Sequence, residues 1–228
     1  MTEQRNIAID LMDQQKYSEA LLIFLNLINA TPGDWSLHYM AGQCYRFTND
    51  YSKAILSLKK AISINPNDPD IFYTLGISHQ LDENYSSSIN ALEQAISLDP
   101  NFYSSYNSIG LNYKKMGKFH KAIEWYSKAT DRIVYAITDQ VTKDKEKCYK
   151  KEIIDGKETL VMLPYMLDKM HELLTANPIY SVINNNIGVC MIDLGDTDSA
   201  RGYFNESIKC IPDGYNYSDP FKNLESIS

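Results

Sequence analysis

The four histidines are the residues best suited to metal or acid–base chemistry, and their spacing argues against both. His171 and Glu172 open the segment HELLT, which lacks the second histidine of a zinc-protease helix. His38, His79 and His120 have no second ligand at a spacing that suits a metal site. We therefore interpret the histidines as helix-surface residues or as packing residues with hydrogen-bonded rings.

Motifs for phosphate binding and for nucleophilic catalysis are absent from the sequence as well. It contains no GxxxxGK[ST] loop, no GxGxxG after a strand and no GxSxG elbow. Asp and Glu are scattered, so that no two of them stand out as a general acid and base. The sequence predicts no catalytic residue, no metal and no cofactor, and we expect that the chain is not an enzyme.

Composition narrows the class of protein further. A hydrophobic content of 44% is typical of a folded, water-soluble chain, and a net charge of -7 argues against coating nucleic acid or an anionic membrane. The most apolar run, residues 20–28, is too short to span a bilayer, and the first residues lack the features of a secretory signal. The cysteines form no CxxC pair, which is typical of a reducing compartment. We expect a cytoplasmic protein that does not insert into membranes.

One segment departs from the acidic average. Between Lys114 and Lys151 there are eleven Lys or Arg against five Asp or Glu. Charge pairs four residues apart along a solvated helix explain such a run. A docking surface for an acidic partner is the alternative, and nucleic acid is disfavoured because no recognition motif accompanies the charge.

The sequence repeats every 34 residues, and this repeat predicts the secondary-structure elements that hold the side chains discussed above. Four columns share this spacing, and each holds one kind of residue. The columns are Pro32, Pro66 and Pro100; Gly42, Gly76 and Gly110; Ala20, Ala54, Ser88 and Ala122; and Tyr17, Tyr51, Tyr85 and Phe119. Because four columns coincide in one phase, the chain is predicted to be a repeat protein.

The period and the residue types resemble the tetratricopeptide repeat (TPR) family. In residues 70–100 the pattern positions hold Phe72, Leu75, Gly76, Ser88, Leu92, Ala95 and Pro100. The fourth unit matches at Tyr106, Ile109, Gly110, Tyr113, Ala122, Tyr126 and Ala129, with Val134 where proline usually ends the second helix. The resemblance implies an all-α fold, a right-handed α-solenoid of antiparallel helix pairs.

We expect repeats at residues 1–34, 35–68, 69–102 and 103–136, then an extended helix, an insertion and a degenerate repeat over 137–180. A further repeat at 181–214 carries Gly188, Ala200, Phe204 and Pro212 in register, and 215–228 form a tail or capping helix with Phe221 and Leu224 as contacts. Residues 163–174 are predicted to be helical from their apolar spacing. Asp155-Gly156 favours a small β-hairpin near 148–162, and a helix interrupted by a loop is the alternative.

The resemblance also implies where a partner would bind, because the first helices of TPR units line a concave face. The residues expected on that face are Arg5, Ile9, Tyr39, Gln43, Arg46, Phe47, Tyr73, Ile77, Gln80, Asn107, Leu111, Lys114, Asn185 and Val189. Their amides, aromatic rings and cations suit the capture of a peptide. The alternative for aromatic members such as Tyr39 and Tyr73 is packing against the neighbouring unit.

We therefore expect a protein-interaction scaffold or adaptor that holds a peptide segment of a partner protein. The alternatives are a regulatory or targeting subunit of an enzyme or secretion system, and an enzyme that uses the region 135–175 through Tyr149, Lys151 or His171. Some TPR proteins bind chaperone carboxylates through a lysine and asparagine clamp. The corresponding positions here include Arg5, Ile9 and Thr74, so that role is not expected. The sequence leaves the oligomeric state open.

Overall fold

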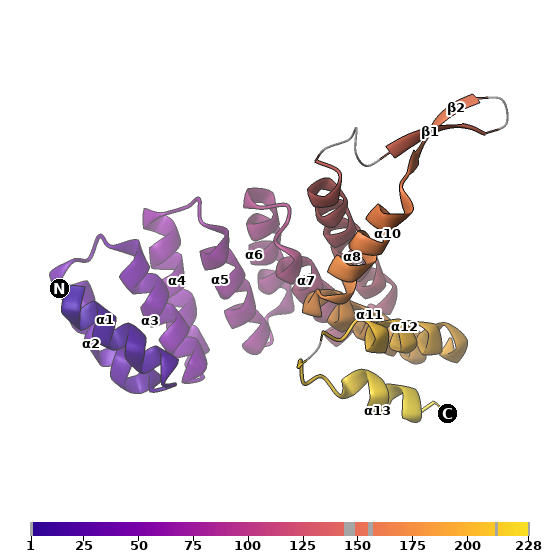
Figure 1. Ribbon diagram of the computed structural model, residues 1–228. Helices are drawn as coiled ribbons and strands as arrows, with labels where there is room; N and C mark the ends of the chain where they lie inside the picture. The colour runs from indigo at the N-terminus through magenta and orange to yellow at the C-terminus, as the bar shows by residue number, and fades with distance from the viewer. Residues whose placement is uncertain (1, 144–148, 155–156, 213, 228) are drawn as a thin grey trace. The chain divides into compact units, whose positions relative to one another are not determined.

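The computed structural model describes residues 2–143, 149–154, 157–212 and 214–227. The chain divides into two compact units, Met1–Met116 and Gly117–Ser228. Helices make up most of each unit (Figure 1). The predicted all-α solenoid of antiparallel helix pairs is confirmed.

Helices of similar length follow one another in the N-terminal unit. They are α1 (Thr2–Asp13), α2 (Tyr17–Ala30), α3 (Trp35–Phe47), α4 (Tyr51–Ile64), α5 (Pro69–Leu81), α6 (Tyr85–Leu98) and α7 (Tyr103–Lys115). Each packs against the next, and α3 also contacts α5, as α5 contacts α7. The first helices α3, α5 and α7 therefore form a continuous row.

Side-chain caps at two recurring positions begin α3, α4, α5 and α6. Asp34 and Asp68 accept from backbone N–H groups two residues ahead, each at 3.0 Å, and start α3 and α5. Asp50 and Asn84 accept from N–H groups three residues ahead, at 3.2 and 3.3 Å, and start α4 and α6. Each cap satisfies a donor that the first turn of a helix leaves free.

The turn between the two helices of a pair also recurs. Gln15, Asn49 and Glu83, each 34 residues after the last, have φ angles of 60°, 61° and 58°. A residue in this left-handed region commonly ends a helix, because it redirects the chain while the last carbonyls keep their hydrogen bonds.

Glycine lets the two helices of a pair cross closely. A Cβ atom on Gly42 would lie 2.8 Å from Leu58 Cγ, and one on Gly76 would lie 2.6 Å from Leu92 Cγ. Both distances are too short for carbon atoms, so the second helix approaches to a distance that only glycine permits. The glycine column of the sequence therefore marks the helix crossings.

Each helix pair buries its apolar side chains against the next pair. One core cluster joins Ala8 of α1 and Phe24 of α2 to Leu37 of α3, and another joins Leu58 of α4 and Leu75 of α5 to Ala91 of α6. Contacts of this kind, made mainly between neighbours in the chain, are typical of solenoids.

The C-terminal unit adds a small hairpin to its helices. Its elements are α8 (Phe119–Val141), β1 (Tyr149–Ile154), β2 (Lys157–Met162), α10 (Pro164–Thr175), α11 (Pro178–Asp193), α12 (Thr197–Lys209) and α13 (Asp219–Glu225). Helix α8 runs well past the position where proline ends the second helix in earlier repeats, as predicted.

The segment with two sequence interpretations forms a β-hairpin. Strands β1 and β2 pair antiparallel from Tyr149 opposite Met162 to Ile154 opposite Lys157. Asp155 and Gly156, whose turn propensity favoured this hairpin, lie outside the described residues. The alternative of a helix interrupted by a loop is wrong.

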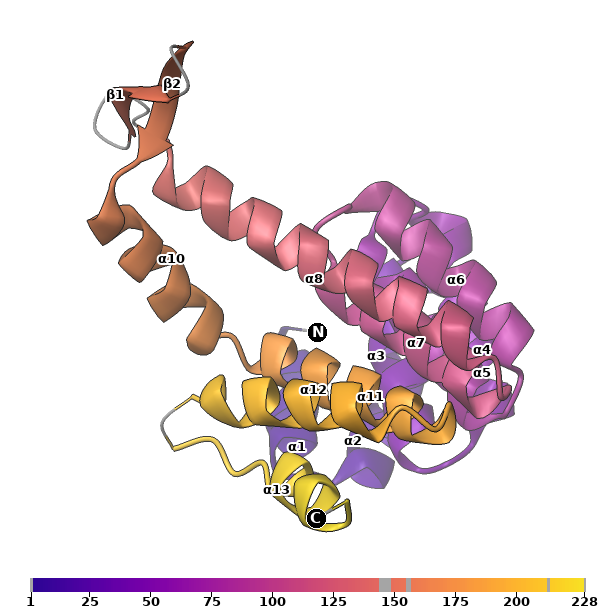
Figure 2. The ribbon, with the colours of Figure 1, turned by 90° about the vertical axis from the view of Figure 1, so that its right-hand side faces the viewer.

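Helix α8 packs directly against both α10 and α11 (Figure 2). The helix predicted at residues 163–174 is present as α10, and the segment near 148–162, which as a helix would have been its partner in the degenerate repeat, is the hairpin. The long α8 serves as that partner instead. Within the next pair, a Cβ atom on Gly188 of α11 would lie 2.5 Å from the ring of Phe204 on α12.

The last described helix, α13, covers part of α11 and α12. Of the two contacts expected here, Phe221 is 47% exposed and Leu224 is half-buried, whereas Pro220 is buried. Pro220, Asn223 and Leu224 share one face at helical spacing, and Phe221 points about 100° away from Pro220. Asn223 donates to the side-chain oxygen of Asn185 on α11 at 2.8 Å.

Replacing Tyr126 with phenylalanine is expected to stabilise the C-terminal unit by about 1 kcal/mol. Tyr126 is fully buried, and its hydroxyl has no hydrogen-bond partner among the described atoms. Burial raises the pKa of this hydroxyl far above its ordinary value, so it stays protonated. Urea denaturation should show a higher midpoint with an unchanged slope. Tyr135→Phe, at an exposed site on the same helix, is the control and should leave the midpoint unchanged. A lower midpoint for Tyr126→Phe would mean that the hydroxyl is hydrogen-bonded.

The described residues include neither a membrane-spanning helix nor a cluster of metal ligands. None of their helices combines the length and apolar character needed to cross a membrane. Nor do three His, Cys, Asp or Glu side chains in this part of the chain gather as metal ligands.

Candidate functional site

Most residues predicted to bind a peptide lie on α1, α3, α5 and α7 of the N-terminal unit. We call the side chains that they contribute the first-helix face. Asn185 and Val189 lie on α11 of the other unit, which is treated separately.

At the start of this face, Arg5 and Ile9 of α1 make packing and polar contacts within the fold. The guanidinium of Arg5 lies 3.3 Å from the carboxylate of Asp34 and donates to the hydroxyl of Ser36, so it joins α1 to the beginning of α3. Ile9 packs against the core cluster of α1, α2 and α3.

Arg46 and Phe47, at the end of α3, form the most distinctive group on the face. The Phe47 ring stacks on Tyr17 with 4.3 Å between centroids and 11° between planes, and the Arg46 guanidinium lies 4.0 Å from the Phe47 centroid. Arg46 Nε is buried, and the described part of the chain offers its side chain neither a hydrogen bond nor an ion pair. Burial lowers the pKa of Arg46, but an arginine remains charged at neutral pH.

Tyr39 and Tyr73 contact neighbouring repeats while remaining partly exposed. The Tyr39 hydroxyl lies 3.5 Å from Thr74 Oγ1, and its ring packs against the core cluster of α4, α5 and α6. Burial raises the pKa of Tyr39, so the hydroxyl stays protonated. The Tyr73 ring is tilted against Phe102 at 5.1 Å. Both rings therefore pack between repeats, as the alternative interpretation held, and both residues remain partly accessible.

Gln80 belongs to a buried polar chain that the sequence did not reveal. Its amide donates to Asn112 Oδ1 at 2.7 Å and to the Ser108 carbonyl at 3.3 Å. Asn112 is fully buried and donates to the Ser88 hydroxyl at 2.8 Å. These bonds tie α5, α6 and α7 together and occupy the Gln80 amide.

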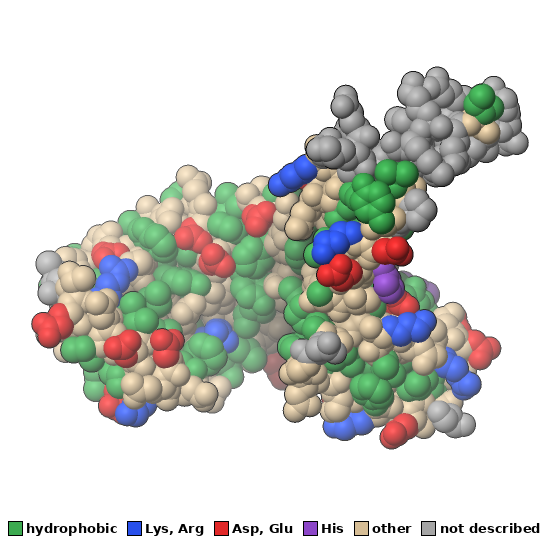
Figure 3. All heavy atoms as spheres, in the orientation of Figure 1, with side chains coloured by type: hydrophobic (Ala, Val, Ile, Leu, Met, Phe, Trp, Pro, Cys, Tyr) green, Lys and Arg blue, Asp and Glu red, His purple; other side chains and the backbone are tan. Residues whose placement is uncertain are grey.

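The remaining predicted residues of the N-terminal unit are half-buried, each with part of its side chain accessible. They are Gln43 on α3, Ile77 on α5, and Asn107, Leu111 and Lys114 on α7. Figure 3 shows one side of the protein, on which hydrophobic side chains of the N-terminal unit lie among carboxylates. The row of first helices thus offers apolar, amide and cationic groups side by side.

On α11 the two predicted residues differ in exposure. Asn185 is 5% exposed, and Asn223 of α13 covers it. Val189 is half-buried. In this arrangement the Asn185 amide is engaged by the chain itself rather than free for a ligand.

The histidines and the basic segment make few contacts that suggest chemistry. His38 Nε2 lies 3.0 Å from the Pro32 carbonyl, and His79 is buried with Nδ1 unpartnered among the described atoms. The expectation of a hydrogen-bonded ring is therefore wrong for that nitrogen of His79. Within the basic segment, Lys128 pairs with Glu124 one turn away at 2.7 Å, as expected for a solvated helix. Tyr149 and Lys151, named for the enzyme alternative, have side chains outside the described set.

Family models match the middle of the sequence. A model described as "TPR repeat" matches residues 42–82, and one described as "Tetratricopeptide repeat" matches residues 69–102 and 103–132. No curated protein matches the sequence.

Many solved structures share the fold at low sequence identity. A crystal structure of MamA is 20% identical, covering 90% of this chain and 94% of its own, with a TM-score of 0.63. MamA 41-end from Desulfovibrio magneticus RS-1 is 19% identical, with 92% and 93% covered and a TM-score of 0.65. YrrB, described as a TPR protein with an unusual peptide-binding site, is 16% identical, with 97% and 90% covered and a TM-score of 0.61. The family models thus identify tetratricopeptide repeats within residues 42–132, and the solved structures share the fold that the glycine crossings and recurring turns build.

Proposed function

We propose that the chain is a protein-interaction scaffold whose first-helix face binds an extended segment of a partner protein, and that Arg46 binds an acidic group of that segment. The observation that carries the proposal is the arginine itself. Its Nε is buried without a partner in the described structure, and its guanidinium stacks on Phe47, whose ring in turn stacks on Tyr17.

A buried N–H group is costly unless a hydrogen-bond acceptor satisfies it, even on a side chain such as Arg46 that is partly exposed. A carboxylate from a bound peptide would supply that acceptor, because the planar guanidinium matches a carboxylate with two parallel hydrogen bonds. Apolar contacts along the same row of helices come from the half-buried side chains of Ile77, Leu111, Tyr39 and Tyr73. Peptide binding by YrrB supports the proposal as an analogy within the same fold.

Selection from a displayed library of random peptides tests this function even before the partner is identified. The full chain is expected to enrich peptides with an Asp or Glu at a fixed position, and Arg46→Gln to bind those peptides at least tenfold more weakly. Arg46→Lys keeps the charge but loses the two-pronged geometry, so an intermediate affinity is expected.

Arg132→Gln provides a control of equal charge change, since Arg132 is exposed on α8. It should leave peptide affinity unchanged. The proposal fails if the selected peptides carry no acidic residue, if Arg132→Gln weakens binding as much as Arg46→Gln, or if no peptide is enriched.

A further inference from the structure

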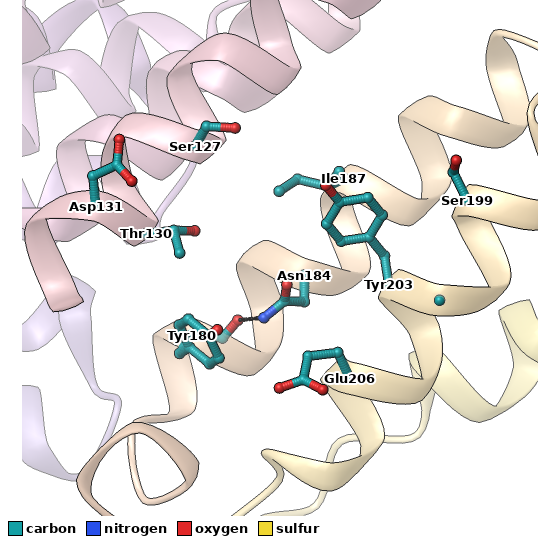
Figure 4. A pocket seen from close by; sticks show the side chains of 10 residues that line it. Ser127, Thr130, Asp131, Tyr180, Asn184, Ile187, Ser199, Tyr203 and Glu206 are labelled. Carbon is teal, nitrogen blue, oxygen red and sulfur yellow. Dashed lines mark hydrogen bonds between the residues drawn. The ribbon is translucent and has the colours of Figure 1, made fainter. Parts of the chain in front are cut away.

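A cavity of about 510 Å³ lies within the C-terminal unit, between α8, α11 and α12 (Figure 4). It belongs to a different unit from the first-helix face and shares no residue with it. Small side chains make the space: Ser127 and Thr130 stand on the α8 wall, and Ser199 and Gly202 on the α12 wall. A Cβ atom on Gly202 would meet nothing within 4 Å, so this wall is open.

Hydrogen-bond acceptors surround the cavity. Asp131 on α8 and Glu206 on α12 stand on opposite walls, as Figure 4 shows. No Lys, Arg or His is among the lining residues that the structure describes. Glu206 has one cation nearby, Lys209 at 3.8 Å, and the 70% exposure of that lysine makes the pair a weak one.

A third acceptor, on the floor of the cavity, belongs to Asn184, a residue that is almost completely buried. Asn184 is 5% exposed, and its Nδ2 donates to the Tyr180 carbonyl at 2.9 Å. This bond turns the amide oxygen away from Tyr180 toward the cavity (Figure 4). In the described part of the chain no hydrogen bond to that oxygen is recorded, and the oxygen is not sealed off from solvent, so a donor that enters the cavity can reach it.

Two aromatic rings complete the lining. Tyr180 and Tyr203 face the cavity from α11 and α12. Burial, and then the negative charge of Glu206, raise the pKa of Tyr180, so its ring stays neutral. A neutral tyrosine ring attracts a cation through its π face.

We propose that this cavity binds an organic cation with several N–H donors, namely a guanidinium or ammonium group. Such a group satisfies Asp131, Glu206 and the Asn184 oxygen at once and packs against the tyrosine rings, which an anion or a neutral apolar group does not. The volume also far exceeds that of a metal ion, and only two carboxylates line it. The cation comes either from a basic side chain of a partner protein or from a small free amine.

Calorimetric titration of the full chain separates these sources. The probes are a capped peptide Gly-Gly-Arg-Gly-Gly, the same peptide with neutral citrulline in place of arginine, and agmatine, which is the free guanidinium amine. The arginine peptide is expected to bind at least tenfold more tightly than the citrulline peptide. Agmatine weaker than the arginine peptide assigns the cation to a protein side chain, and agmatine equal to it or tighter assigns it to a free amine.

Substitutions of the two lining carboxylates test whether the probes bind in the cavity. Asp131→Asn and Glu206→Gln should each weaken the cationic probes at least fivefold, and the double variant should abolish binding while melting at nearly the same temperature. Asp168→Asn, an equal charge change at an exposed site on α10, should bind normally. Equal affinity for arginine and citrulline, a loss with Asp168→Asn as large as with Asp131→Asn, or no binding of any probe would overturn the proposal. None of these outcomes depends on peptide binding at the first-helix face.

Discussion

Leucine in place of Gly76 is expected to unfold the helix pair α5 and α6 at temperatures where the unchanged chain is folded. The Cβ atom alone would lie 2.6 Å from Leu92 Cγ, 2.8 Å from Leu92 Cδ2 and 3.3 Å from the Ser88 carbonyl oxygen. Overpacking of a core typically costs 1–3 kcal/mol, and we expect about 3 kcal/mol or more here, because backbone as well as side chain blocks the new atoms. Circular dichroism should show a melting midpoint lowered by roughly 6 °C or more.

A matched substitution and a rescue separate this clash from a general effect of leucine. Gly33→Leu places the same side chain in the turn before α3, where a Cβ atom meets nothing within 4 Å, and should leave the midpoint nearly unchanged. Gly76→Ala should cost much less in a Leu92→Ala background, because the atoms that clash are then absent. If the cost is the same in both backgrounds, close approach of the helices is not the reason for glycine.

Asn112→Ala is expected to destabilise the N-terminal unit by about 2–4 kcal/mol. The substitution removes a fully buried side chain and leaves the Ser88 hydroxyl and the Gln80 amide without the partners they have at 2.8 and 2.7 Å. Urea denaturation should show a lower midpoint. Asn90→Ala, at an exposed position of α6, should cost nothing measurable, since alanine is the better helix former. Equal midpoints for Asn112→Ala and the unchanged chain would show that the polar chain contributes no net stability.

The fold could be predicted from the sequence because the repeat is imposed by backbone geometry. Gly42 and Gly76 stand where only glycine permits the crossing, and the recurring prolines end the second helices. Such requirements return at every period and are visible before the packing is known. A residue with left-handed backbone angles also recurs at this period, at Gln15, Asn49 and Glu83. Because the three residue types differ, the sequence did not show this recurrence.

Regions without the repeat were harder to predict, since their packing partners come from elsewhere in the chain. The sequence of α10 indicates a helix but carries no sign that its neighbour is the long α8. Likewise, α13 buries Pro220 rather than the larger Phe221. The face of α13 that meets α12 depends on the orientation in which the preceding loop places the helix. Hydrophobicity alone favoured Phe221.

For the candidate site, the sequence predicted which helices present the residues but not which side chains the fold already uses. Arg5, Gln80 and Asn185 are engaged by Asp34, Asn112 and Asn223, and such pairings depend on distances between repeats. One signal could have exposed Asn112. At the same repeat position the other units hold Cys44, Ser78 and Cys190. These three residues and Asn112 are all fully buried. An asparagine among small buried residues needs polar partners.

The buried cysteines allow the opening of each unit to be followed separately. Burial raises the pKa of the Cys44 thiol to about 11, and burial together with Glu206 raises that of Cys210 to about 12, so neither ionises appreciably while its helices stay packed. The thiolate is the reactive form, so a thiol reagent can label these sites only when the surrounding helices separate. In a Cys148→Ser variant, the labelling rate of Cys44 would report how often the N-terminal unit opens. The labelling rates of Cys190 and Cys210 would report the same for the C-terminal unit. A single sample could thus report whether the two units open together or one at a time.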